Sequence, residues 1–358
     1  MAWNRRKRRN GGGRGGRNGA QGGVHGGPLF AALDLGTNNC RMLIAAPARD
    51  GIRVVDSFSR IVRLGEGLEA SGRLAEPAIE RTLAALSVCA KIMGKYPIAA
   101  VRGVATEACR RAVNGREFLD RVFARTGIRL DPIGFEEEAA LTLAGCAPLL
   151  DATFPYALTF DIGGGSTELM WIDQRDGSPR PLGIATMPHG VVTLLERIGD
   201  PTPATGDYAR LVDEIDADLD AFERAHGIAA HVSADRVHML GTSGTVTTLG
   251  GIHLNLRRYD RSKVDGMNIG FADLEAVSAR LAAMDCEARA KHPCIGPERA
   301  DLVLMGCAIL AAVCRRWPVG RLRVADRGIR EGLLLAMMKE AAATRPETPP
   351  SAALAAAR

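Results

Sequence analysis

The stretch TFDIGGGSTEL (residues 159–169) joins a short apolar run, a glycine turn and the start of a second apolar run. Three consecutive glycines carry no Cβ atoms, so their backbone N–H groups can approach a bulky anion together. Asp161 supplies an oxygen ligand of the kind that Mg²⁺ prefers, and two hydroxyl side chains follow the glycines. The stretch predicts a strand–turn–strand hairpin beside a divalent cation. Its phosphate-binding residues would be Gly163, Gly164, Gly165, Ser166 and Thr167.

A second segment with the same plan lies earlier in the chain, ALDLGTNNCRMLIA (residues 32–45). An apolar strand again ends near an aspartate, Asp34, and a turn around Gly36 and Asn38 leads into a returning apolar strand. The chain between Asp34 and Asp161 is long enough to form a domain. The repeat therefore predicts two related halves that face each other across a cleft.

The rest of the chain alternates apolar strands with helical periodicity, which is typical of an α/β protein. Strand pairs are predicted at residues 29–46 and 156–172, single strands at 99–105 and 236–240, and helices at 77–96, 107–122, 139–149 and 208–226. Thr106 is the expected N-cap of the second of these helices. The segment Gly241–Thr245 is expected to open a further helix and to offer backbone donors at its N-terminus.

Charge is distributed unevenly over the 358 residues. The formal net charge is +5, but residues 1–27 hold seven basic residues, no acidic residue and ten glycines. Without this segment the chain is nearly neutral, so we do not expect the folded body to bind nucleic acid through a basic surface. Residues 1–27 should form a disordered basic tail that can hold RNA or another polyanion weakly, and residues 341–358 a flexible C-terminal tail.

Composition excludes several other classes of protein. Aromatic residues are 4% of the chain, too few for a platform that stacks single-stranded nucleic acid. The longest apolar run in the C-terminal part, residues 302–313, is too short to span a bilayer. The eight cysteines show no CxxC spacing, and no apolar segment follows the basic N-terminus as in a secretory signal. We therefore expect a cytoplasmic protein without membrane contact.

Charged residues near the two turns are the candidates for chemistry. The acids at residues 136–138 come just before the helix at 139–149, where their negative charges stabilise the helix by interacting with the positive end of its dipole. One of them can deprotonate a water that attacks a terminal phosphorus. Arg110 and Arg111 are adjacent on a helix, so at most one faces the cleft. Arg41, just after the first turn, either meets phosphate or points outward.

Seven segments, in this order along the chain, resemble the exopolyphosphatase and guanosine pentaphosphate phosphohydrolase family, a branch of the actin-like, Hsp70-like and sugar-kinase superfamily. They are ALDLGTNNCRMLIA (32–45), VATEACRRAVN (104–114), EEEAALTLAG (136–145), TFDIGGGSTEL (159–169), LGTSGT (240–245), PERADLVLMG (297–306) and VADRGIREGLLL (324–335). The resemblance implies a short form with two actin-like (ribonuclease H-like) α/β domains, residues 28–135 and 136–340, and an active site in the cleft between them.

The resemblance also implies a reaction and assigns roles. Water removes a terminal phosphate, either from inorganic polyphosphate or from the 5′ end of pppGpp. Glu138 is the candidate base, which decides among the three acids. Asp161 and Glu168 are the other catalytic acids, near Mg²⁺ or Mn²⁺, with Asp161 as the metal ligand. The phosphate-binding residues implied are Gly36, Thr37, Asn38, Arg41 and Arg110, with Gly163, Gly164, Gly165, Ser166 and Thr167 on the second turn.

Three positions depart from the pattern that the resemblance sets. Gly134-Phe135 stands where Ser-Gly is common, Thr193 where Arg is usual, and Asp265 where His is frequent. None of them touches the turns or Glu138, so they bear on substrate preference rather than on hydrolysis. His189 is interpreted as an incidental loop residue.

Other functions remain open from the sequence. A nucleoside pocket near Gly241–Thr245 would favour pppGpp over polyphosphate. A sugar kinase or ATPase of the same superfamily would need a nucleotide pocket and a sugar-facing aspartate. A polyanion- or RNA-binding protein without enzymatic activity would depend on residues 1–27. The sequence does not decide the oligomeric state, and a homodimer is compatible with it.

Overall fold

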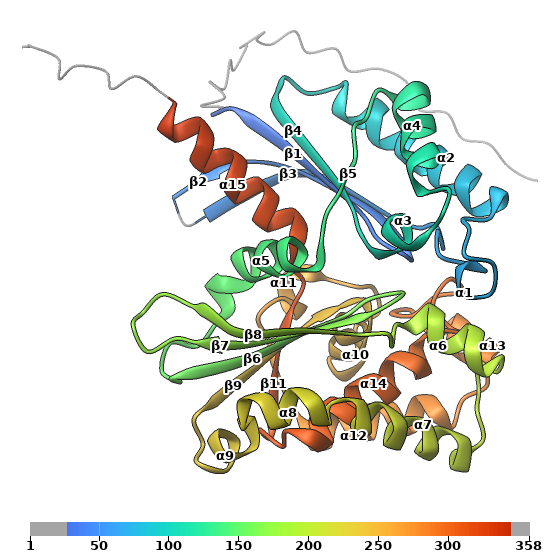
Figure 1. The fold of residues 1–358 in the computed structure, drawn as a ribbon, viewed down its shortest axis with the longest axis vertical. Coiled ribbons are helices and arrows are strands. Elements are labelled where there is room, and N and C mark those ends of the chain that lie inside the picture. The colour runs from blue at the N-terminus through green and yellow to red at the C-terminus, as the bar shows by residue number, and fades with distance from the viewer. Residues whose placement is uncertain (1–26, 50, 345–358) are drawn as a thin grey trace, which may run out of the picture.

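The computed structural model describes residues 27–49 and 51–344. Figure 1 shows two lobes, each built around a β-sheet with helices packed against it. Almost all of the predicted tail at residues 1–27, and most of the tail predicted at residues 341–358, lie outside the described residues. Residues 341–343 were expected to be part of the C-terminal tail, but they continue the last helix.

The first sheet has the strand order β3-β2-β1-β4-β5. Its strands are β1 (Leu29–Leu35), β2 (Asn39–Ala48), β3 (Gly51–Ile61), β4 (Ile98–Ala105) and β5 (Asp131–Pro132). The second sheet has the order β10-β11-β9-β6-β7-β8. Its strands are β6 (Tyr156–Ile162), β7 (Thr167–Asp173), β8 (Arg180–Met187), β9 (Val237–Ser243), β10 (Asn268–Gly270) and β11 (Arg321–Ala325).

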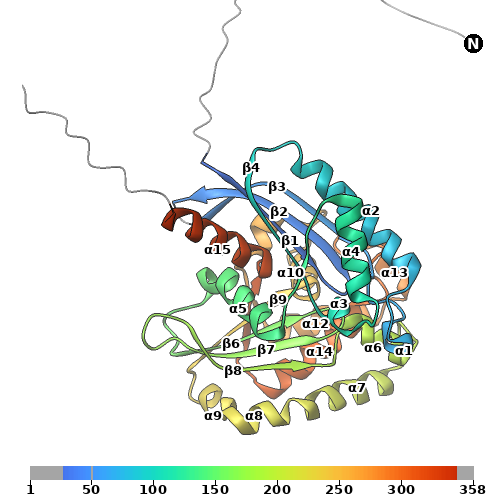
Figure 2. The same ribbon diagram turned by 45° about the horizontal axis from the view of Figure 1, so that its top comes forward.

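Helices cover both sheets (Figures 1 and 2). Those of the first lobe are α1 (Leu68–Ser71), α2 (Glu76–Met93), α3 (Glu107–Arg111) and α4 (Gly115–Thr126). Helix α5 (Phe135–Cys146) and a short 3₁₀ turn (Ala147–Leu149) lead into the second lobe. There follow α6 (Val191–Ile198), α7 (Thr205–Asp218), α8 (Asp220–His226), α9 (Ile228–Ser233), α10 (Gly244–His253), α11 (Arg261–Val264), α12 (Phe271–Ala282), α13 (Cys286–Lys291), α14 (Val303–Arg316) and α15 (Ile329–Ala343). No helix in the described ranges is long and apolar enough to cross a membrane.

The internal repeat predicted from the sequence is confirmed by the topology. In the first lobe β1 pairs antiparallel with β2 and parallel with β4, and in the second lobe β6 pairs antiparallel with β7 and parallel with β9. Asp34 lies opposite Arg41 in the first hairpin, and Asp161 lies opposite Glu168 in the second. The two hairpins therefore present an aspartate at the same place in each lobe.

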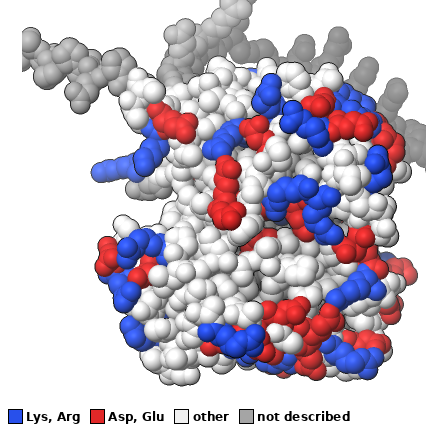
Figure 3. Space-filling model, in the orientation of Figure 1, with Lys and Arg blue, Asp and Glu red and all other residues white. Residues whose placement is uncertain are grey.

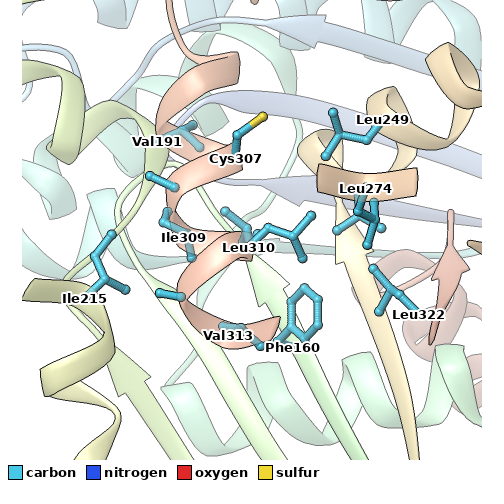
Figure 4. Packing of buried hydrophobic residues seen from close by; sticks show 14 of the residues in the cluster. Phe160, Val191, Ile215, Leu249, Leu274, Cys307, Ile309, Leu310, Val313 and Leu322 are labelled. Carbon is cyan, nitrogen blue, oxygen red and sulfur yellow. The ribbon is translucent and has the colours of Figure 1, made fainter. Parts of the chain in front are cut away.

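Helix α14 is the centre of the core of the second lobe. Its residues from Val303 to Val313 are apolar on every side, as expected for a helix that is buried on every side. Figure 4 shows Leu310 and Val313 of α14 close to Phe160 of β6. Because Phe160 directly precedes Asp161, this packing fixes the strand that carries the second aspartate.

The last helix changes the division into domains. Helix α15 was placed in the second domain by the predicted division at residues 135 and 136. It packs instead on β1 of the first sheet and on α5. Leu333 and Leu334 of α15 share a buried cluster with Phe30, Ala32 and other residues of the first lobe. The chain thus crosses between the lobes twice, through α5 and again just before α15 (Figure 1).

Local structure differs from the prediction at two helices. The helix expected at residues 107–122 is broken into α3 and α4, because Asn114 bonds the backbone N–H and carbonyl of Leu74 at 2.9 and 3.1 Å. Thr106 makes no side-chain cap hydrogen bond. The helix expected at 208–226 is divided at Leu219 into α7 and α8.

Helices α5 and α15 approach each other closely at a pair of glycines. A Cβ on Gly145 would lie 2.1 Å from the carbonyl oxygen of Gly328, and a Cβ on Gly332 would lie 2.1 Å from that of Leu141. Neither oxygen can move without shifting a helix backbone. Glycine is therefore required here for packing.

We expect Gly145→Ala to destabilise the protein by about 1–3 kcal/mol, because the added methyl group forces α5 away from α15. The measurement is the thermal midpoint in calorimetry or dye-based melting. Gly206→Ala in α7 is the matched control, since its Cβ would meet nothing within 4 Å. Equal midpoints for the two variants would contradict the packing argument.

Candidate active site

A cavity of about 110 Å³ lies between the two lobes. The first hairpin contributes Asp34 and its turn, and the second contributes Asp161 and its glycines. Glu138, in the first turn of α5, lines the same cavity. The other predicted residues that line it are Gly36, Thr37, Asn38, Arg41, Gly163, Gly164, Gly165, Ser166 and Glu168. The structure thus brings both turns and the predicted base together.

The two turns touch each other across the cleft. A Cβ on Gly164 would lie 3.0 Å from the backbone nitrogen of Asn38 and 3.1 Å from the Cβ of Thr37. Gly164 is also approached closely from within its own lobe, since a Cβ on Gly190, just before α6, would lie 2.3 Å from the carbonyl carbon of Gly164. The glycines are needed for this close approach as well as for exposing N–H groups.

The carbonyl groups of the glycine turn point to helix α6. The N–H groups of Val191 and Val192 donate to the carbonyl oxygens of Gly163 and Gly164 at 3.0 and 2.8 Å. Thr193 Oγ1 donates to the carbonyl oxygen of Gly165 at 3.1 Å. Because α6 binds the carbonyl oxygens, the glycine turn keeps a fixed backbone conformation in which its N–H groups are available to an anion.

Four partly buried acids line the cavity, Asp34, Glu138, Asp161 and Glu168, and the loss of solvent raises the pKa of all four. The pKa of Glu138 rises to about 8, through burial and then the charge of Glu168. Burial raises the pKa of Asp161 to about 7, and burial with the charge of Asp161 raises that of Glu168 to about 7. Burial also raises the pKa of Asp34. Such a cluster favours the binding of a cation, which would stabilise the ionised carboxylates.

Two arginines line the cavity without a carboxylate partner among the described residues, so their charge can act on a bound anion. Arg41 of β2 and Arg299, in the segment before α14, both line it. Within residues 27–49 and 51–344 neither one forms an ion pair, although Arg299 donates to Thr248 Oγ1 at 3.3 Å. A third arginine, Arg330, lines an adjoining space together with Asp34 and Asp161. Guanidinium groups without carboxylate partners are suited to hold phosphate oxygens.

Arg110, predicted to bind phosphate, lies elsewhere. It does not line the cavity but the groove beside it. Its guanidinium donates to Glu138 Oε2 at 3.0 Å and to the carbonyl oxygen of Ile133 at 2.5 Å. Arg110 therefore contacts the predicted base, and its contact with phosphate stays a prediction. The hydrogen bond from Arg110 holds one carboxylate oxygen of Glu138 and lowers the pKa of Glu138. Burial raises this pKa by more, so the net change is upward.

Two hydroxyl groups of the second turn also differ from the prediction. Thr167 is fully buried and its hydroxyl donates to the carbonyl oxygen of His189 at 2.6 Å, so this hydroxyl is not the phosphate donor that was expected. Ser166 does line the cavity, but its hydroxyl donates to Glu168. Successive side chains of a strand point to opposite faces of the sheet. Thr167, the first residue of β7, lies on a face that is buried, so its hydroxyl turns inward.

His189 is not an incidental loop residue. Its side chain is almost fully buried, and its Nε2 lies 2.6 Å from Asp218 Oδ2. Its carbonyl oxygen holds Thr167. His189 therefore holds the first residue of β7 from outside the cavity.

Gly241, at the start of the predicted nucleoside pocket, has no room for a ligand. A Cβ there would lie 2.6 Å from the ring of Phe160, since β9 continues through Gly241 to Ser243. Only residues 243–245 of that segment reach the cavity. The structure does not support a nucleoside pocket at Gly241.

Some residues of the site were not predicted. Glu107 and Asn39 line the cavity from the first lobe, and Arg299 lines it from the second. Glu107 Oε1 accepts from Arg111 Nη1 at 3.2 Å, while its Oε2 is buried without a hydrogen-bond partner among the described residues. Glu107 stands in TEACRR (106–111) and Arg299 in PERADL (297–302), within segments that carry the family resemblance.

The groove beside the cavity carries charge of both signs. It is lined by the acids Glu69, Glu107, Glu196, Glu214 and Asp218 and by the arginines Arg110, Arg111 and Arg197. All three arginines are ion-paired: Arg110 with Glu138, Arg111 with Glu69 and Glu107, and Arg197 with Glu214. On the face drawn in Figure 3 basic and acidic side chains likewise lie interspersed over both lobes. The unpaired positive charge is therefore inside the cavity rather than in the groove.

We expect Arg110→Gln to move the acidic limb of the pH–rate profile to higher pH by about one unit, if Glu138 is the base. A base must be deprotonated, and removing Arg110 removes the charge that lowers its pKa. Activity should fall more at pH 7 than at pH 9. The measurement is kcat/KM between pH 6 and pH 10.

Arg102→Gln is the matched control for this shift. Arg102 pairs with Glu137, the neighbour of Glu138, at 2.6 Å on the surface. An unchanged limb in the Arg110 variant, or an equal shift in both variants, would contradict the coupling between Arg110 and Glu138.

Residues 43–341 match the Ppx/GppA phosphatase family. The chain is 31% identical over 321 residues to Exopolyphosphatase 2 of Mycobacterium tuberculosis strain H37Rv, covering 86% of this chain and 98% of that protein. It is 28% identical to the guanosine-5′-triphosphate,3′-diphosphate pyrophosphatase of Photobacterium profundum, covering 87% of this chain and 60% of that protein.

Solved structures show the same fold. The crystal structure of an exopolyphosphatase-like protein has a TM-score of 0.79 at 30% identity, covering 88% of this chain and 99% of that chain. The Ppx/GppA family member from Aquifex aeolicus has a TM-score of 0.71 at 27% identity, covering 88% of this chain and 98% of that chain. The two-domain architecture predicted from the sequence is thus shared with proteins of known structure.

Proposed function

Since the chain belongs to the Ppx/GppA phosphatase family, we propose that it hydrolyses the terminal phosphoanhydride bond of inorganic polyphosphate. One observation supports this most. Glu138, whose pKa is raised, lies in the same cavity as the two glycine turns and as two arginines that have no carboxylate partner in the described part of the chain. A base, an anion site and a group of acids for a cation are the parts that phosphoryl transfer to water needs.

Asp161 and Glu168 fit a hard divalent cation, Mg²⁺ or Mn²⁺. Both are partly buried carboxylates whose pKa values are raised to about 7, and a bound cation would lower these pKa values again. No three His, Cys, Asp or Glu side chains in the described part of the chain are grouped so as to hold a metal alone. Mg²⁺ commonly takes one or two carboxylates and completes its shell with phosphate oxygens and waters. When bound, the cation would neutralise charge on the transferring phosphoryl group.

The protein's own residues supply the remaining steps. Glu138 Oε2 accepts from Arg110, which leaves the other carboxylate oxygen to take the proton of the attacking water. Arg41 and Arg299 approach from opposite lobes and hold oxygens of the terminal phosphate. Contact between the two turns limits the entry of bulk water.

The 5′-phosphate of pppGpp is the second candidate substrate. The observation in its favour is the groove beside the cavity, whose arginines are all paired with acids. Such a lining repels an extended polyanion and leaves room for a part of the substrate that carries less charge. A homologue of this chain is named for that reaction.

Phosphate release from long-chain polyphosphate and from pppGpp, measured side by side with Mg²⁺, tests the proposal. A higher kcat/KM for polyphosphate is expected. A higher value for pppGpp would support the second candidate. Release from neither substrate, together with transfer of the γ-phosphate of added ATP to an added sugar and formation of ADP, would indicate a kinase and overturn both.

Two expectations complete the proposal. We propose that the protein acts in the cytoplasm and that residues 1–27 make a weak, salt-dependent contact with long polyanions. Truncation of this segment would then leave activity on short substrates unchanged.

A further inference from the structure

The loop after β3, residues 62–67, is bonded to the first phosphate turn. The N–H groups of Val62 and Arg63 donate to the carbonyl oxygen of Asn38 at 2.8 and 3.1 Å. The N–H group of Gly65 donates to the carbonyl oxygen of Thr37 at 2.9 Å. Any movement of this loop therefore moves the backbone of the turn that lines the cavity.

The same loop reaches across the cleft to the second lobe. The guanidinium of Arg63 contacts Asp301 through both nitrogens, with Nη1–Oδ2 at 2.8 Å and Nη2–Oδ1 at 2.9 Å. Its Nη2 also donates to the carbonyl oxygen of Glu298 at 3.1 Å. A second bond between the lobes joins the N–H of Gly67 to Glu196 Oε1 at 2.7 Å. Paired contacts of this kind fix the orientation of both partners.

Arg63 makes this contact from an unusual backbone conformation. Its φ angle is 48°, in the left-handed region that a residue with a Cβ seldom adopts. The loop is held in this shape from behind, since Arg81 Nε donates to the carbonyl oxygen of Val62 at 3.0 Å. Strained residues persist where surrounding contacts determine them, often at functional sites.

The partner of Arg63 stands two residues after Arg299 in the chain. Arg299 lines the cavity, while Arg63 and Asp301 do not. Both side chains of the ion pair are partly buried, at 29% and 23% exposure, so solvent screens the pair less than a surface pair. The pair thus ties the segment that carries Arg299 to the turn formed by Thr37 and Asn38.

We infer that Arg63 is a positioning residue. Together with Asp301 it holds the lobes closed and directs Arg299 to the phosphate that the first turn binds. Arg63 itself does not touch substrate in this arrangement. The inference rests on the proposed function only for the identity of the substrate, because the ion pair between the lobes exists whatever the cavity binds.

The test combines kinetics with Mg²⁺-tripolyphosphate and small-angle scattering without substrate. Arg63→Ala and Asp301→Ala should each lower kcat/KM about 10-fold, and the double variant should be no worse than either single variant. The exchanged pair, Arg63→Asp with Asp301→Arg, should recover part of the loss. Scattering should give the two single variants a larger radius of gyration than the parent protein.

Arg121→Ala is the matched control. Arg121 pairs with Glu76 at 2.6 Å, and both residues belong to the first lobe. This variant should keep the parent activity and radius. Additive losses in the double variant, no recovery in the exchanged pair, or an unchanged radius in the single variants would each overturn the inference. If the parent protein hydrolyses no phosphoanhydride, the proposed function fails, and scattering still decides the role of Arg63.

Discussion

Glu138→Gln should lower kcat by about 100-fold or more while leaving the fold and substrate binding intact, the size of effect expected from losing a general base. Glutamine keeps the shape of the side chain and its contact with Arg110, but it cannot take a proton. The structure strengthens this expectation, because Glu138 lines the cavity from the junction of the lobes with its pKa raised to about 8. The measurements are steady-state kinetics with polyphosphate and calorimetric binding of a nonhydrolysed phosphate chain.

Glu136→Gln is the matched control, since Glu136 stands in the same helical turn but does not line the cavity. It should keep the parent kcat. A kcat within a few fold of the parent for Glu138→Gln would remove this residue from the role of base. Weakened binding without a change in kcat would assign it to substrate binding instead.

Arg41→Met should lower kcat/KM by roughly 10- to 100-fold, the range expected when a hydrogen bond to a charged group is lost. Arg41 faces the cavity from β2, opposite Asp34 in the hairpin, and forms no ion pair among the described residues. Its charge is therefore available to phosphate. Removing it also removes a charge that lowers the pKa of Asp161, so the acids bind a cation less well at neutral pH.

Arg60→Met on β3 is the comparison for this variant, because Arg60 lies over the ring of Phe58 away from the cavity. Kinetics and thermal midpoints should be measured for both. If Arg41→Met loses no more activity than Arg60→Met, Arg41 does not hold substrate. If its midpoint falls while its kcat/KM stays high, its role is structural.

The two predicted turns are confirmed as strand–turn–strand hairpins, and their role in binding phosphate stays a prediction. Gly36 and the three glycines beginning at Gly163 form the turns that were expected, because glycine and the flanking apolar strands determine a hairpin within a dozen residues. Arg110 shows the limit of this reasoning. Its place on α3 was visible in the sequence, but its partner, Glu138, comes from a helix 28 residues further on.

The sequence by itself determined the repeat of two hairpins, the α/β class, and the family to which the chain belongs, since all of these depend on residue types at short spacing. Tertiary structure decided which groups share the cavity. It turned the hydroxyl of Thr167 into the core, brought Glu107 and Arg299 into the site and placed α15 on the first sheet. These outcomes depend on how segments far apart in the chain pack together. Packing is set by the shapes of both surfaces at once, and no single stretch of sequence contains both.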